Sequence, residues 1–165
     1  MHLDLRRYLD EVAQTHAADP LGYLWEFGPV HAWWHRERRS ELQPIGFLTF
    51  HRLLIRSFRR TFPGGWIPVQ PASLLPFPSV LADRAAATHD LAALQAYSAA
   101  LEGWHDGVHG TIGGGFGDPQ HDVLLRWFWE FHLFLDLQFS RALESWGVPW
   151  TTYVATVPEA DQRLI

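Results

Sequence analysis

The chain has 165 residues, a formal net charge of −5 and 47% hydrophobic residues. This length predicts one domain over residues 1–165, and the apolar content predicts a packed core rather than disorder. A mildly acidic chain is a poor candidate for binding nucleic acid through its phosphates. The sequence contains no cysteine, which excludes disulfides, thiolate metal sites, iron–sulfur clusters held by cysteine and a cysteine nucleophile.

The N-terminal residues show no signal-peptide pattern, because Asp4, Arg6 and Arg7 interrupt them and no apolar segment follows. No apolar run approaches the ~18 residues that identify a membrane-spanning helix. We therefore expect a cytoplasmic protein with neither a nucleic acid nor a membrane as its partner.

Hydrophobic periodicity predicts an all-α chain, with no signal for a strand hairpin. Apolar residues at helical spacing predict a first helix over 3–18, and Pro29 is the expected first residue of a second helix that runs to about Ser40. An amphipathic helix is expected over 45–62, where arginines lie opposite the apolar face. A proline-rich loop is expected over 63–78, followed by a short helix over 79–86. The next helix is capped by Thr88 or Asp90 and runs to about His109, and an irregular glycine-rich segment follows over 110–119. A last helix is expected over 121–145, with His121 and Asp122 as candidate caps, before an extended tail over 150–165.

Six of the ten histidines form two units of the same order, each a His-x3-His pair followed by a single histidine in a later apolar helix. The two units are His31, His35 and His51, and His105, His109 and His132. Residues i and i+4 share a helix face, with Cβ atoms about 5–6 Å apart, so two imidazoles can bind one metal ion. A third imidazole completes a three-nitrogen site with open positions, which suits Zn, Cu, Fe or Ni. The pattern predicts a four-helix bundle core that holds a dinuclear metal centre, joined by long Pro- and Gly-rich loops.

Three segments resemble motifs of the type-3 copper proteins, the family of tyrosinases, catechol oxidases and hemocyanins. Residues 47–52, Phe-Leu-Thr-Phe-His-Arg, resemble the Phe-Leu-Pro-Trp-His-Arg motif that carries the third ligand of the first copper. Residues 105–109, His-Asp-Gly-Val-His, with Ile-Gly-Gly at 112–114, resemble the His-Asn-x-Val-His…Val-Gly-Gly motif of the second copper. Residues 128–136 resemble Phe-Trp-Leu-His-His-x-x-x-Asp, with His132 at the ligand position.

The resemblance implies two copper ions as cofactors and O2 as co-substrate, in an unusually short member of the family. One histidine unit would bind the first copper and the other unit the second. The resemblance also implies an ion pair between Arg52 and Asp136. Glu102 and Asp106 are the candidate catalytic residues beside the second copper, where Asp106 replaces the family's Asn.

The resemblance therefore implies a copper-dependent oxidoreductase, a tyrosinase-like monooxygenase or oxidase that acts on a small phenolic or aminophenolic substrate. We expect the substrate to enter near the glycine-rich segment and the 63–78 loop. Three alternatives remain: a non-catalytic protein that binds O2 or handles copper, a zinc or di-iron helical-bundle enzyme, and a helical interaction module with core histidines. A small apolar bundle with exposed tryptophans can also form a homodimer.

Overall fold

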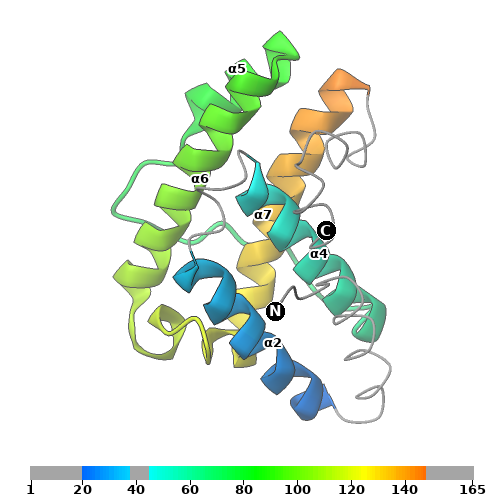
Figure 1. The fold of residues 1–165 in the computed structure, drawn as a ribbon, viewed down its shortest axis with the longest axis vertical. Coiled ribbons are helices and arrows are strands. Elements are labelled where there is room, and N and C mark those ends of the chain that lie inside the picture. The colour runs from blue at the N-terminus through cyan, green and yellow to red at the C-terminus, as the bar shows by residue number, and fades with distance from the viewer. Residues whose placement is uncertain (1–19, 38–44, 148–165) are drawn as a thin grey trace.

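The computed structural model describes residues 20–37 and 45–147. Within these ranges the chain forms helices and no strand, which confirms the all-α prediction. The α-helices are α2 (Pro20–Arg36), α4 (Gly46–Thr61), α5 (Ser79–Thr88), α6 (Leu91–Ile112) and α7 (Arg126–Trp146), and the 3-10 helices are η1 (Gly114–Gly117) and η2 (Asp122–Leu124) (Figure 1). The helix expected over 3–18 and the tail 150–165 lie outside the described residues.

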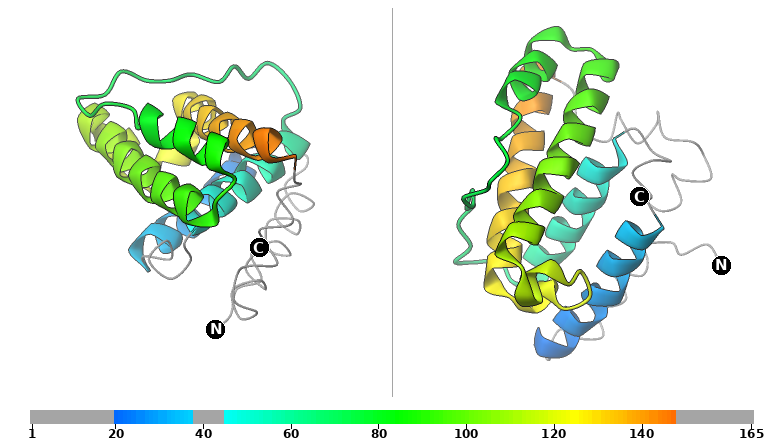
Figure 2. Two further views of the ribbon diagram at one scale, coloured as in Figure 1. Left: turned by 90° about the horizontal axis from the view of Figure 1, so that it is seen from above. Right: turned by 90° about the vertical axis from the view of Figure 1, so that its left-hand side faces the viewer.

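The helices lie alongside one another, as the two views of Figure 2 show. Helix α4 packs against α6 and α7, and α5 covers the far ends of α6 and α7. Helix α2 contacts η2, in the segment that joins α6 to α7. This arrangement places residues of α2, α4, α6 and α7 near one end of the molecule.

Residues 63–78 run along the outside of the molecule from the end of α4 to the start of α5 (Figure 2). Two hydrogen bonds attach this loop to the helices: Val69 N donates to Glu130 O at 3.0 Å, and Trp104 Nε1 donates to Leu75 O at 3.1 Å. The loop is therefore attached to α6 and α7 at two points, although most of its residues are exposed.

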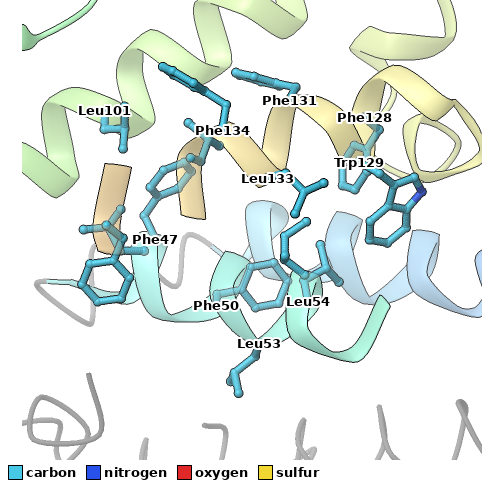
Figure 3. Packing of buried hydrophobic residues seen from close by; sticks show 14 of the residues in the cluster. Phe47, Phe50, Leu53, Leu54, Leu101, Phe128, Trp129, Phe131, Leu133 and Phe134 are labelled. Atoms are coloured by element: carbon cyan, nitrogen blue, oxygen red, sulfur yellow. The ribbon is translucent and has the colours of Figure 1, made fainter. Parts of the chain in front are cut away.

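Large aromatic side chains fill the core between α4 and α7 (Figure 3). Phe58 of α4 stacks on Trp129 of α7 with ring centroids 3.8 Å apart, and Phe27 of α2 meets the same indole edge-on. Trp34, Trp104 and Trp129 are buried, which confirms that these tryptophans serve as core residues. Aromatic packing of this kind holds a small helical domain together through area and ring geometry.

Helix α2 corrects the expectation for Pro29, because the helix begins at Pro20 and contains Pro29 in its interior. A proline inside a helix removes one backbone hydrogen bond. Here Pro29 itself is exposed, whereas its neighbours Phe27 and Val30 are buried in the core. Because Phe27 and Val30 are buried on either side of it, α2 continues past Pro29 despite the lost hydrogen bond.

Helix α6 begins as predicted, with the Asp90 carboxylate accepting from Ala92 N at 3.1 Å. It continues to Ile112 and ends at Gly113, whose φ of 64° is in the left-handed region that favours glycine. Helix α7 begins at Arg126, five residues after the predicted start. The proposed cap Asp122 belongs instead to the separate turn η2, where its side chain makes no capping bond and is buried.

Candidate metal centre

The structure brings the six predicted ligands into one cluster. They come from α2 (His31 and His35), α4 (His51), α6 (His105 and His109) and α7 (His132). Within the first unit the ring centroids lie 4.6–5.7 Å apart, and within the second unit they lie 4.4–5.6 Å apart. We call these two units the first and the second triad. Four members, His31, His51, His105 and His132, are at most 1% exposed and have ligand atoms within 4.8 Å of one another. These four residues can hold a metal ion.

Helix geometry orients the histidines on α4 and α7. The Nδ1 atom of His51 donates to Phe47 O at 2.7 Å, and the Nδ1 atom of His132 donates to Phe128 O at 2.7 Å. Each acceptor is the carbonyl four residues earlier on the same helix. A proton on Nδ1 leaves the Nε2 atom of each ring with a free lone pair that faces the cluster.

The connection between α6 and α7 orients two more rings. His31 Nδ1 donates to Pro119 O at 3.0 Å, and His109 Nδ1 donates to Phe116 O. The Phe116 ring also stacks on His109 with centroids 4.3 Å apart. Loop backbone in 116–119 therefore fixes one imidazole of each triad.

His105 is oriented by a neighbouring carboxylate. Its Nδ1 atom donates to Asp106 Oδ1 at 2.9 Å. Such an outer partner fixes the tautomer of a metal-binding imidazole and raises its basicity. Five of the six rings thus have Nδ1 bonded outside the cluster and Nε2 directed into it.

The inward nitrogens have the spacing of metal ligands. His105 Nε2 lies 3.1 Å from His132 Nε2, although the Nδ1 atom of each ring already carries the proton that it donates elsewhere. Two bare lone pairs at this distance repel each other unless a cation lies between them. Two nitrogens bound at 2.0–2.1 Å to one metal lie about 2.9–3.4 Å apart. The Nε2 atoms of His51 and His109 are buried with no hydrogen-bond partner. The donor set therefore fits metal ions.

Burial holds five of the six histidines in their neutral form. Burial lowers the pKa of His35 to about 2, and burial lowers the pKa of His51, His105 and His132 well below 6.5. Burial also lowers the pKa of His109. Neutral imidazole is the form that binds metal, so the apo site carries no bound protons that a metal must displace at neutral pH.

A buried carboxylate lies between the two triads. Asp122 is 0% exposed, with Oδ1 3.3 Å from His31 Nδ1 and Oδ2 3.5 Å from His109 Nδ1. The sequence pattern indicates only a helix cap at Asp122, because apolar periodicity does not locate a short 3-10 turn. The Asp-Pro-Gln-His-Asp run at 118–122, so rich in turn-forming residues, was the available signal that the helix starts later.

A cavity of about 360 Å³ opens onto the cluster. Its lining consists of four of the histidines together with two carboxylates and loop residues: His31, His35, His105, Asp106, His109, Gly110, Gly117, Pro119 and Asp122. The glycine-rich connection thus contributes to the cavity as expected, whereas no residue of the 63–78 loop lines it. Asp106 lies at the cavity, and burial raises its pKa. Glu102 is half-buried on α6 and is absent from the lining, so its catalytic role stays a prediction.

Comparison with protein-family models, curated proteins and solved structures found no match for this chain. Among the described residues, no helix is long and apolar enough to cross a lipid bilayer. The geometry of the histidine cluster and the three motifs are therefore the features that indicate a function.

Proposed function

We propose that this chain is a copper-dependent oxidoreductase that uses O2 at a dinuclear centre to hydroxylate or oxidise a small phenolic or aminophenolic compound. In this proposal α2, α4, α6 and α7 form a four-helix core around the metals. The observation that carries it is the facing pair of unprotonated nitrogens, His105 Nε2 and His132 Nε2, at 3.1 Å. A core histidine pair in a purely structural module would share a proton across that distance.

Two metal ions, rather than one, follow from the number and grouping of the donors. Each triad supplies three imidazoles, and its ligands come from two helices, α2 with α4 or α6 with α7. A single ion at the four fully buried histidines would leave His35 and the orphan His109 Nε2 unused, although both residues face the same cluster.

The donor chemistry favours copper or zinc over a di-iron centre. Helical di-iron proteins use several glutamates as ligands, whereas all six donors here are imidazoles. Copper and zinc both accept imidazole, and the resemblance to type-3 copper motifs selects copper. Bound copper would supply the activation of O2.

The chain itself orients the imidazoles, excludes water from their buried side and provides a proton acceptor. Phe47, Phe50, Phe128 and Phe131 surround the imidazoles and exclude water from their buried side. The cavity leaves the other side of four histidines open to a small molecule. Asp106 lies at this opening and is the carboxylate best placed to accept the phenolic proton of a substrate.

The charge of the cavity restricts the substrate. Two carboxylates line it, Asp106 and Asp122, and no arginine is among the lining residues. Bound cations would offset Asp122, which lies beside the imidazoles, so Asp106 supplies the negative charge at the opening. Beside Asp106 a protonated amine on the phenol is attracted, whereas a substrate carboxylate is repelled. The cavity is lined by one chain, so a homodimer stays a separate prediction.

The test is reconstitution of the metal-free protein with copper under air, followed by metal counting and near-ultraviolet absorption. We expect two coppers per chain, an intense near-ultraviolet band that requires O2, and oxidation of a phenol, catechol or aminophenol. The zinc-loaded protein is the control and should show neither the band nor turnover.

Other outcomes separate the alternatives. Two coppers with reversible O2 binding and no phenol oxidation would favour a carrier. One metal per chain would overturn the dinuclear centre in favour of a mononuclear site at the four buried histidines. Absence of metal binding would leave a structural histidine core.

A further inference from the structure

Asp122 lies beside both triads, a position that its place in the cavity lining does not explain. Its two carboxylate oxygens point to different triads, Oδ1 toward His31 and Oδ2 toward His109. Both oxygens are buried and have no hydrogen bond of good geometry. The carboxylate is therefore shared between the triads but fully satisfied by neither.

The neighbouring imidazoles give this carboxylate little compensation in the metal-free protein. The Nδ1 protons of His31 and His109 are directed to the carbonyls of Pro119 and Phe116, which are their hydrogen-bond acceptors. A buried carboxylate without a cation or adequate hydrogen bonds destabilises the folded state. On these contacts, Asp122 lowers the stability of the metal-free fold.

The backbone of η2 holds Asp122 in this position. Asp122 N donates to Asp118 O at 2.8 Å, and Leu125 N donates to Asp122 O at 2.9 Å. The turn therefore keeps the side chain beside the two imidazoles whether or not metal is bound. A carboxylate fixed in this way is organised in advance for positive charge on both sides.

We propose that Asp122 is a charge-balancing positioning residue common to both metal ions. This inference rests on the metal-binding part of the proposed function. Each cation would lie one imidazole away from the same carboxylate, through His31 for the first triad and His109 for the second. The carboxylate attracts both cations and polarises both ligands, so it strengthens metal binding at the expense of the stability of the metal-free fold.

The proposal predicts effects of opposite sign for Asp122→Asn, which removes the charge and preserves the shape. The metal-free variant should unfold at a higher urea concentration than the wild type. Its affinity for copper, measured by competition with a chelator of known affinity, should fall at least tenfold at both positions, the range seen when outer partners of metal ligands are removed. Asp122→Ser is a second variant that removes the charge and leaves room for water.

Asp118→Asn is the matched control. Asp118 lies in the same loop, pairs with a histidine through His121 Nδ1 at 2.7 Å, and is half-exposed. The control variant weakens the exposed contacts of Asp118 to His121 and to Gln120 N, so it should lower the urea midpoint slightly, opposite in direction to Asp122→Asn, and leave the affinity for copper unchanged.

Two results would overturn the inference. If Asp122→Asn lowers the stability of the metal-free protein and leaves copper affinity intact, the carboxylate has a structural role only. If the wild type binds two coppers and the variant binds them equally tightly, charge balance is wrong while the dinuclear centre stands. A wild type that binds no metal would instead contradict the proposed function itself.

Discussion

Arg52 Nε donates to Asp136 Oδ1 at 2.6 Å, so the residue after His51 on α4 is paired with the residue four positions after His132 on α7. Arg52 also donates to the Asp136 carbonyl and to the Ser140 hydroxyl. The pair predicted from the resemblance is thus confirmed. It connects the helices that carry the last histidine of each triad, so it fixes the spacing of the two triads along one side of the cluster.

Replacing Arg52 by methionine should be strongly destabilising. The guanidinium is largely buried, and its loss leaves the Asp136 carboxylate without its partner, which typically costs about 3–5 kcal/mol. Urea denaturation of the metal-free protein measures this cost. The control is Arg36→Met, because Arg36 forms an exposed pair with Glu37 at 3.7 Å and should lose less than about 1 kcal/mol. Equal costs for the two variants would contradict a structural role for the buried pair.

Removal of a single ligand should halve the copper content. His35 is the mildest position for this change, because its ring is partly exposed and borders the cavity. We expect His35→Gln to bind one copper and to lose the O2-dependent near-ultraviolet band and phenol oxidation. His121→Gln, which changes an exposed histidine outside the cluster, should keep both coppers. Two coppers and full activity in His35→Gln would remove this residue from the first triad.

The clustering of the six histidines could be predicted from the sequence because their positions follow from helix periodicity. A His-x3-His pair lies on one helix face wherever the helix begins, so errors in the boundaries left the ligand set unchanged. The start of α2 was missed because Pro29 resembles a helix start and its tolerance depends on burial of Phe27 and Val30, a tertiary property. Asp122 was missed for a related reason: its role follows from the folding of η2 against α2, which is a contact between residues distant in sequence.

Gly28 sets the contact between α2 and the turn η2. A Cβ atom at Gly28 would overlap the carbonyl oxygen of Gln120, which precedes η2 by two residues. Gly28 lies almost one turn before His31 on α2. The absence of a side chain at Gly28 therefore determines how closely His31 approaches Pro119 and Asp122.

Gly28→Ala should destabilise the protein and weaken copper binding together. Overpacking of this kind typically costs about 1–3 kcal/mol, and the backbone carbonyl of Gln120 cannot move as a flexible side chain can. Gly103→Ala is the matched control, because Gly103 is at an exposed position of α6 where a Cβ atom meets nothing within 4 Å. The control should stabilise the protein by about 0.5–1 kcal/mol through helix propensity alone. Thermal unfolding and chelator competition measure both effects, and an unaffected Gly28→Ala variant would show that the contact is not tight.

The metal-free protein should lose stability as the pH falls from 7.5 to 5.5. Burial lowers the pKa of five cluster histidines: His35, His51, His105, His109 and His132. Below the ordinary histidine pKa of 6.5 the unfolded chain takes up protons at these residues while the folded chain does not, so the unfolding free energy decreases with falling pH. Each such histidine lowers the unfolding free energy by up to about 1.4 kcal/mol for each pH unit below its ordinary pKa.

Other charged groups that face the cluster modify this slope only slightly. The raised pKa of Asp106 acts in the opposite direction, but only nearer the ordinary carboxylate range, and the Asp122 carboxylate raises the pKa of His109 in opposition to burial. Urea titrations of the metal-free protein at pH 7.5, 6.5 and 5.5 measure the slope. An unfolding free energy that is constant over this range would contradict a neutral buried cluster.

The charge of the cavity should appear as a preference among substrates that share one phenol ring. Tyramine carries a protonated amine, p-cresol is neutral and 3-(4-hydroxyphenyl)propionate carries a carboxylate. With the Asp106 carboxylate at the opening of the cavity, kcat/KM should decrease in that order. A single charge interaction near a protein surface is worth about 1 kcal/mol or more, which corresponds to a difference of about fivefold in kcat/KM between consecutive substrates of this series.

Asp106→Asn should reduce the differences in kcat/KM among the three substrates. Glu144→Gln, an equal change of charge on the exposed far end of α7, should leave these differences intact. The preference should also weaken at high salt, because Asp106 is partly exposed and its field is screened. Faster oxidation of the propionate than of tyramine would show that Asp106 does not select the substrate.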